Sequence, residues 1–520
     1  MRLLKKNIYI AAILLSVMVV ASSCTKNFSE INTNPTAVTS MNTKYLLPNT
    51  ELHIAGTRYE TWRMDLIYLD EWSQQLAGTG WGADRYQYSD SYSSAYWNTA
   101  YDNYVKPLQN IIHILRADSA ANTNKLAVAK IWRAFVFQRI TDVWGDVPYT
   151  QAGKGLWTHD YKPTFNTQKS IYMSIINQLE EANKMFNPNQ PTYGKADLMF
   201  QGDITKWKKF DNSLLMNAGL RLSKVDPTLA EKVVKKAYQN GVMTSNNDIA
   251  YIAHPGGPDG INKSGIGQVF QDFGVTGHDF RCSNTLINRL VKFHDPRLFI
   301  YSGVYTDKGQ NVTPSKPDSM MGLRNGLTSA DLTNLNTYKY AQPNRDIMVT
   351  YSAPTIFVSY AEVCFDEAEA AHRGWIQGSA DTYYNNGIQA AMKQLTLYNS
   401  TKAVISDNAI SSYEQDPYVD LNSTSTYDSN PKDPVLDKII TQKWLACFLN
   451  GYEAYDNWRR TGYPMLTPGA SQGQTNGQIP RRVRYPEELQ TLNQTNYQQA
   501  VSDLNGGDLM TSRVWWDVKK

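Results

Sequence analysis

The sequence predicts a mainly α-helical protein built from paired helices that are joined by long irregular loops. Apolar residues recur at helical spacing through most of the chain from Leu52 onward. Several of these segments come in pairs separated by a short or medium loop, which is typical of stacked helix hairpins. The expected helices are Leu52–Leu76, Ser94–Arg116, Lys125–Val143, Thr167–Met185, Ile204–Ser223, Thr228–Gln239, Thr355–Arg373, Ala380–Leu397, Leu436–Asn450 and Gly451–Arg460.

The segment Lys125–Val143 is expected to be the central helix. Its apolar residues point to nearly every side of a helix, which indicates burial among other helices. Gly145 can close a helix end in the left-handed conformation, and Pro148 cannot continue a helix. We therefore expect a sharp stop, followed by the aromatic exit Trp144–Tyr149.

Long polar stretches rich in Gly, Asn and Tyr separate the helical blocks. The clearest are residues 246–282, 300–354, 415–434 and 461–520. Loops of this length are uncommon unless they are functional or disordered. Their aromatic content favours ordered packing or binding loops.

The N-terminus has the pattern of an export signal. Met1–Lys6 is positively charged, and Ile8–Val20 is a short apolar stretch of signal-peptide length. The following Ala-Ser-Ser-Cys resembles a bacterial lipobox, which predicts lipid attachment at Cys24. Several acyl chains on one residue anchor a protein stably to a membrane. The alternative is an ordinary signal peptide with an incidental cysteine.

These features predict the division of the chain. Residues 1–23 are the signal peptide, residues 24–45 are the lipidated cysteine and a polar tether, and residues 46–520 form a single helical domain. No segment after the signal peptide has the length and hydropathy of a membrane span.

Charge and cysteine content exclude several classes of protein. The formal net charge is +3, and the signal peptide alone contributes three positive charges. No basic run resembles a phosphate-binding stripe, so nucleic acid is not an expected partner. Cys282, Cys364 and Cys447 have no close spacing, which argues against a disulfide framework or a zinc site. We expect Cys364 and Cys447 to be small core residues.

Five motifs together resemble the SusD/RagB-like outer-membrane nutrient-binding lipoproteins of Bacteroidetes, more narrowly the SusD-like branch. The motifs lie in the family's order along the whole chain. They are FSEINTNPTAVTS, RITDVWGDVPYTQA, SYAEVCFDEAEAAHRGW, ITQKWLACFLNGYEAYDNWRRTGYP, and IPRRVRYPEELQTLNQTNY followed by TSRVWWD.

The resemblance implies a scaffold of tetratricopeptide-like helix pairs with long irregular loops packed on one side. It implies a lipoprotein of the outer membrane, facing the cell exterior and held by its N-terminal lipid only. The implied partner is a SusC-like TonB-dependent transporter, to which the protein delivers captured oligosaccharides or, in RagB-like members, peptides. It also implies a protein that is not an enzyme.

The residues themselves favour no catalytic centre. A glycosidase needs two carboxylates on a cleft, whereas Asp366 and Glu369 share a charged helix face, and Glu453 and Asp456 lie beside two arginines. No protease, nucleotide-binding or metal-binding motif occurs. We expect no catalytic residue, no metal and no cofactor. A lipid-anchored glycoside hydrolase and a purely structural adaptor remain as alternatives.

Aromatic side chains in loops are the remaining functional signal. A flat ring can bind the apolar face of a sugar, while neighbouring polar groups bind its hydroxyls. The richest such stretch is GTGWGADRYQYSDSYSSAYWN (residues 78–98), and the resemblance points to a second loop in the middle of the chain. The residues expected to bind ligand are Trp81, Arg85, Tyr86, Tyr88, Tyr338 and Tyr340.

The arginines of the strongest motifs are expected to hold the fold. Buried charges are tolerated when they are paired. We expect Arg133 and Arg139 to meet carboxylates from neighbouring helices, and Arg459 and Arg460 to do the same.

Overall fold

The structure, a computed structural model, describes residues 42–80, 82–258, 260, 262–272 and 280–519. Residues Leu46–Lys520 form one compact unit. Within it, helices dominate and the strands are short, which confirms the predicted fold class. The signal peptide and Cys24 lie outside the described residues, so their roles stay predictions.

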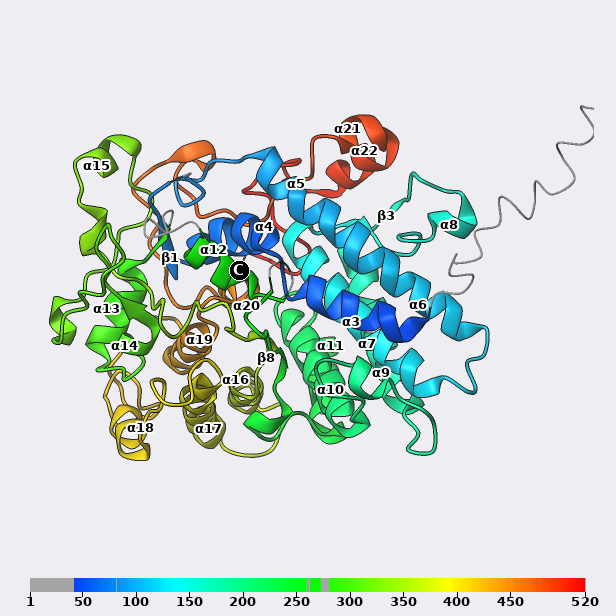
Figure 1. The fold of residues 1–520 in the computed structure, drawn as a ribbon, viewed down its shortest axis with the longest axis horizontal. Helices are drawn as coiled ribbons and strands as arrows, with labels where there is room; N and C mark the ends of the chain where they lie inside the picture. The colour runs from blue at the N-terminus through cyan, green and yellow to red at the C-terminus, as the bar shows by residue number, and fades with distance from the viewer. Residues whose placement is uncertain (1–41, 81, 259, 261, 273–279, 520) are drawn as a thin grey trace, which may run out of the picture. The chain divides into compact units, whose positions relative to one another are not determined.

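The first half of the chain supplies a series of helices that pack in order (Figure 1). The helix α6 packs on α7, α7 on α9, α9 on α10 and α10 on α11. The bounds are α3 (Thr43–Ile54), α4 (Arg58–Glu60), the π-helix η1 (Thr61–Asp70), α5 (Asp90–Thr99), the π-helix η2 (Ala100–Val105), α6 (Lys106–Arg116), α7 (Thr123–Trp144), α8 (Gly155–Thr158), α9 (Gln168–Met185), η3 (Gly194–Ala196), α10 (Ile204–Arg221), α11 (Pro227–Asn240) and η4 (Asn246–Asp248).

The second half continues the helix pairs, with α16 against α17 and α19 against α20, and α16 also meets α10. Between and after these pairs lie many short elements. The bounds are α12 (Gly265–Asp272), α13 (Asn284–Lys292), α14 (Leu298–Tyr301), η6 (Pro317–Ser319), α15 (Ser329–Thr333), η7 (Thr337–Lys339), α16 (Tyr360–His372), α17 (Ala380–Lys393), η8 (Gln394–Leu397), α18 (Asp407–Glu414), α19 (Pro434–Ala446), α20 (Gly451–Thr461), η9 (Gly473–Thr475), α21 (Leu489–Leu492) and α22 (Gln494–Asp503).

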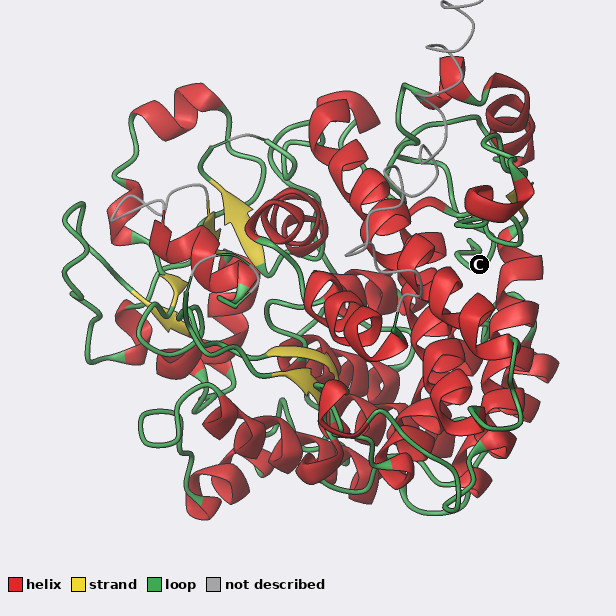
Figure 2. Ribbon diagram, turned by 45° about the vertical axis from the view of Figure 1, so that its right-hand side comes forward, coloured by secondary structure: helices red, strands yellow, loops and turns green. Residues whose placement is uncertain are grey.

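The described strands form four antiparallel pairs, each of two short strands. The small sheets are spread over the molecule: some lie on the side of α13 and α14, one adjoins the end of α7, and one lies between α16 and α11 (Figures 1 and 2). The pairs are β1 (Leu76–Gly78) with β5 (Phe280–Cys282), β2 (Val147–Pro148) with β3 (Phe165–Asn166), β4 (Ala250–Ile252) with β8 (Thr355–Val358), and β6 (Ser302–Gly303) with β7 (Gln342–Pro343).

The helix α7 is the predicted central helix, and it is buried on nearly every side. Gly145 ends it at φ 89°, where the Gly145 N–H donates to the Thr141 carbonyl at 2.7 Å. Trp144 is fully buried and stacks on Tyr96 with ring centroids 5.5 Å apart. The aromatic exit therefore packs inside the protein. None of the helices in the described part of the chain is long and apolar enough to cross a bilayer.

Two predicted helices are wrong in extent. Leu52–Leu76 is interrupted because Gly56 takes φ 92°, and the chain resumes as α4 and η1 before it extends into β1. Thr355–Arg373 begins as strand β8, and the helix starts only after Ser359. The Ser359 hydroxyl accepts the Glu362 N–H, while the Glu362 carboxylate accepts the Ser359 N–H, so this capping box sets the boundary.

Buried ion pairs tie the helix pairs together. Arg460 donates to both carboxylate oxygens of Glu369, at 2.6 Å each. Arg459 pairs with Asp456, and Lys443 pairs with Asp366 at 2.6 Å. The prediction is therefore confirmed for Arg460, whereas Arg459 pairs with a carboxylate of its own helix, α20.

The prediction that Arg133 and Arg139 form ion pairs with carboxylates of neighbouring helices is wrong. Among the described residues, neither guanidinium lies within ion-pair distance of a carboxylate. Arg139 instead lies over the rings of Phe135 (4.5 Å) and Tyr452 (4.6 Å). A ring face can stabilise a cation through its quadrupole, which sequence spacing does not reveal.

Candidate functional site

The two loops predicted to bind ligand meet through strand pairing. Strand β1 leads into the first loop and pairs with β5. The Cys282 N–H then donates to the Ala341 carbonyl at 2.8 Å, and the Ala341 N–H donates to the Met321 carbonyl at 2.8 Å. Through Asp84 and Arg85, the loop that follows β1 (the β1 loop) contacts Gly326 and Ser329, although about 240 positions separate these residues in sequence. We call this meeting of the two loops the junction.

A buried carboxylate fixes the first loop to the second. Asp84 accepts the N–H groups of Gly78 and Gly326, both at 3.0 Å. Burial raises the pKa of Asp84 to about 6, although these two N–H groups partly oppose the shift. Glu71 holds the same turn because its carboxylate accepts the Asp84 N–H at 2.7 Å.

Arg85 and Tyr86 are buried and contact protein groups in this structure. Arg85 is 8% exposed and donates to Ser329 Oγ at 3.0 Å and to the Gly80 carbonyl. Tyr86 is 2% exposed, and its hydroxyl accepts the Gly469 N–H at 2.7 Å. Both side chains hold the loop in place, and their direct contact with a ligand stays a prediction.

Tyr338 and Tyr340 belong to the second loop, in and just after η7, and are half-buried. The guanidinium of Arg281 lies 5.7 Å from the Tyr338 ring centre, and its Nε donates to the Thr337 carbonyl at 2.8 Å. Arg281 comes from β5, so this strand orients the second loop as well as the first. Trp81 lies outside the described residues, and its role stays a prediction.

Tyr88 contacts the C-terminal segment around Arg484 and Tyr485, unlike the other predicted residues. Its hydroxyl donates to Asp90 Oδ1 at 2.9 Å and to the Tyr485 carbonyl at 3.3 Å. The Arg484 guanidinium lies 4.6 Å from its ring centre. One face of this ring is therefore occupied by the C-terminal segment.

An open polar groove of about 310 Å³ adjoins the junction. It is lined by residues that follow β5 and Leu323, together with Gln74 and residues of the segments 427–428 and 465–469. These residues are far apart in sequence and carry no motif, so sequence patterns could not have found them. The polar lining includes Gln74, Asn284, Thr285, Asn288, Arg324 and Asn325.

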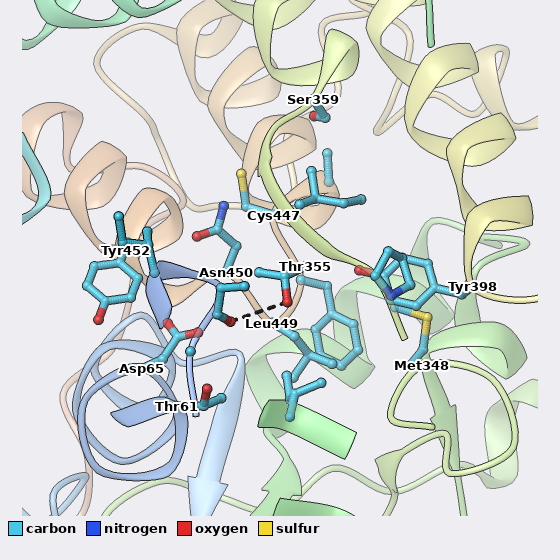
Figure 3. Close-up of a pocket in the computed structure, with 18 of the residues that line it drawn as sticks. Thr61, Asp65, Met348, Thr355, Ser359, Tyr398, Cys447, Leu449, Asn450 and Tyr452 are labelled. Carbon is cyan, nitrogen blue, oxygen red and sulfur yellow. Dashed lines mark hydrogen bonds between the residues drawn. The ribbon is translucent and has the colours of Figure 1, made fainter. Parts of the chain in front are cut away.

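An interior cavity of about 90 Å³ lies elsewhere, between η1, β8 and the start of α20 (Figure 3). Asp65 lines it, and burial raises the pKa of this carboxyl to about 7, although the Arg139 charge partly opposes the shift. This volume is well below the range of about 300–1,000 Å³ typical of small-molecule sites. The cavity is therefore too small to hold an oligosaccharide.

Residues 35–486 match the SusD-like family model, which is described as "Starch-binding associating with outer membrane". The chain belongs to the SusD-like family. This confirms the resemblance drawn from the five motifs.

Solved structures agree with this assignment. A chitin-binding protein is 32% identical to this SusD-like chain, over 92% of this chain and 100% of that chain, with a TM-score of 0.78. A SusD-like protein of Bacteroidetes, AC2a, is 26% identical with the same coverage and a TM-score of 0.79. A chitin-binding SusD homologue from Flavobacterium johnsoniae shares the fold at 23% identity, 92% and 98% coverage and a TM-score of 0.74. No curated protein matches the chain.

Replacing Gly473 with alanine is expected to destabilise the loop junction. Gly473 has φ +52°, and a Cβ there would lie 2.1 Å from the Arg85 carbonyl oxygen and 2.6 Å from that of Tyr86. Because neither backbone atom can move alone, we expect a loss of about 2–3 kcal/mol in unfolding free energy, measured by urea denaturation.

The matched control is Gly374→Ala. Gly374 has φ +73°, but nothing lies within 4 Å of its added Cβ. In this variant only backbone strain lowers the unfolding free energy, by about 1 kcal/mol. Equal losses for the two variants would contradict the close approach at Gly473.

Proposed function

We propose that this SusD-like protein binds oligosaccharides at the junction of the β1 loop and residues 329–340, without catalysing a reaction on them. The observation that carries the proposal is its similarity, at 32% identity over 92% of the chain, to a solved chitin-binding protein. The family description, which names starch binding, supports the same ligand class.

The geometry of the junction suits a sugar chain. Two half-buried tyrosine rings offer faces to the C–H groups of a pyranose ring. The adjacent groove offers amide, hydroxyl and guanidinium groups to the sugar hydroxyls. Hydrogen bonds from Arg85 and Arg281 and to Asp84 hold both loops, so the surface is organised before the ligand arrives.

The carboxylates considered as catalytic candidates are all held in ion pairs, which supports a role in binding without catalysis. Asp366 pairs with Lys443, and Glu369 pairs with Arg460. Glu453 pairs with Arg221 at 2.8 Å, and Asp456 pairs with Arg459. These four groups hold the helical core, where a substrate has no access.

The family description also supports a place at the outer membrane. In this proposal the protein is anchored through a lipid on Cys24 and faces the cell exterior. It passes captured ligand to a SusC-like TonB-dependent transporter by a hinge-type closure over the channel.

The double variant Tyr338→Ala/Tyr340→Ala tests the site. Isothermal titration with chitohexaose and maltohexaose should show binding of at least one of them to the wild type. We expect each ring to contribute about 1 kcal/mol, so the double variant should bind about 10- to 50-fold more weakly. Tyr161→Ala is the control, because Tyr161 is 76% exposed and lies outside the junction.

Three outcomes would contradict the proposal. The first is unchanged affinity in the double variant, which would move the binding site elsewhere. The second is binding of peptides with no response to any oligosaccharide, which would make the protein a peptide-binding member. The third is release of reducing ends from a polysaccharide by the purified protein, which would make it an enzyme.

A further inference from the structure

An open groove of about 780 Å³ lies on the helical scaffold, between α6, α7 and α9 and the turn that follows β2. None of the residues at the β1 loop junction lines it. Its volume falls within the range of about 300–1,000 Å³ typical of small-molecule sites.

The lining of this groove is strongly cationic. It contains Arg116, Lys130, Arg133, Lys154 and Lys169 against a single carboxylate, that of Glu181. Lys130 lies 2.9 Å from Glu181 and is therefore paired. The other four cations have no carboxylate within ion-pair distance in the part of the chain that the structure describes.

Arg133 forms the floor of the groove and is only 7% exposed. Its guanidinium lies beside two rings that contact each other, 4.5 Å from the ring centre of Phe137 and 4.3 Å from that of Tyr149. Its Nη2 donates to the Tyr149 carbonyl at 3.0 Å, and its Nη1 donates to Gln178 Oε1 at 3.3 Å. The cation is thus fixed in place while its charge is left without a counter-ion from the described protein.

Two buried donors at the groove are also unsatisfied. Arg133 Nε and Gln178 Nε2 have no acceptor among the described residues. Burial lowers the pKa of Lys154, and the charges of Arg133 and Arg116 lower it further. Unsatisfied donors and mutually repelling cations are what an anion-binding site shows before its ligand arrives.

We propose that this groove is a second ligand site, which binds oligosaccharides carrying carboxylate or sulfate groups. The cations would meet the acidic groups, and Arg133 would lie deepest. The remaining lining is rich in hydroxyl and amide groups that can bond to sugar hydroxyls. They are contributed by Gln109, Thr150, Thr167, Ser170, Ser174 and Asn177.

The test uses the full mature chain and hexagalacturonate, with a sulfated chondroitin hexasaccharide as a second probe and maltohexaose as the neutral comparison. Isothermal titration at about 20 mM salt should show binding of at least one acidic probe. Because solvent-exposed charges are screened within about 8 Å at 150 mM salt, affinity for it should fall severalfold at that concentration. The variant Arg116→Gln/Lys154→Gln/Lys169→Gln should bind it at least 10-fold more weakly, with unchanged thermal stability.

The matched control is Lys232→Gln/Lys402→Gln/Lys432→Gln, which removes the same charge from exposed positions outside the groove. It should bind the acidic probes like the wild type. No binding of either acidic probe, or equal losses in the groove and control variants, would overturn the proposal. Equally tight binding of hexaglutamate, lost in the same groove variant, would assign the groove to anionic peptides and would also overturn it.

Discussion

The substitution Arg460→Met is expected to lower the unfolding free energy by about 3–5 kcal/mol. Arg460 and Glu369 are 1% and 0% exposed and form a bidentate pair that joins α20 to α16. Burial alone would raise the pKa of Glu369, but Arg460 and Arg373 outweigh it and hold the pKa far below its usual value. Without Arg460, the carboxylate stays buried and retains only Arg373 at 2.8 Å.

Urea denaturation at pH 7 measures this loss. Two further variants show whether the loss comes from the unpaired buried carboxylate. Arg460→Met/Glu369→Leu removes both charges, so it should be more stable than Arg460→Met alone. Lys235→Met breaks the exposed pair with Glu231, whose side chains are 45% and 41% exposed, and should cost less than about 1 kcal/mol. A loss of that small size for Arg460→Met would show that the buried pair does not hold the helices together.

The substitution Glu367→Gln is expected to stabilise the protein at high pH. Glu367 is 8% exposed on α16, and burial, together with the negative charge of Asp366, raises its pKa to about 8. A carboxyl whose pKa is raised by folding favours the folded state at low pH. That contribution disappears as the pH rises from about 4.5 to about 8, because the unfolded chain loses its proton first.

The glutamine variant has no proton to lose, so it should be more stable than the wild type by about 3–5 kcal/mol at pH 9. At pH 4 the two proteins should differ by less than about 0.5 kcal/mol, since the glutamate is then protonated in both states. Urea denaturation at both pH values measures the difference. The control Glu231→Gln changes an exposed carboxyl and should show no such pH dependence. A constant difference between pH 4 and pH 9 would contradict the raised pKa of Glu367.

Local patterns predicted the elements that depend on neighbours in sequence. The all-round apolar pattern of α7 and the Gly145 stop are local, and both are confirmed. The strand β8 was missed because the apolar residues of 355–358 fit either a helix or a strand. The capping box at Ser359 was the available signal for that boundary.

The partners of charged groups also fall into two kinds: those close in sequence could be predicted, and those brought together by folding could not. Arg459 and Asp456 are three positions apart on one helix, so their pairing follows from helical spacing. Arg460 pairs with Glu369, which lies 91 positions away in sequence. The sequence predicted that a carboxylate would pair with Arg460, but it could not identify which one. Arg133 lies beside two aromatic rings and Arg139 lies near three, because tertiary packing places rings closer to these guanidinium groups than any carboxylate.

The sequence by itself determined the helical class, the position of the central helix and the SusD-like family, because these depend on periodicity and on contiguous motifs. Only the tertiary structure decided how far the described side chains predicted to bind ligand are exposed. It buries Arg85 and Tyr86 as supports, covers one face of Tyr88, and leaves Tyr338 and Tyr340 half-buried at the junction. The cationic groove was equally hidden, since its charges come from α6, α7, α9 and a turn that meet only after folding.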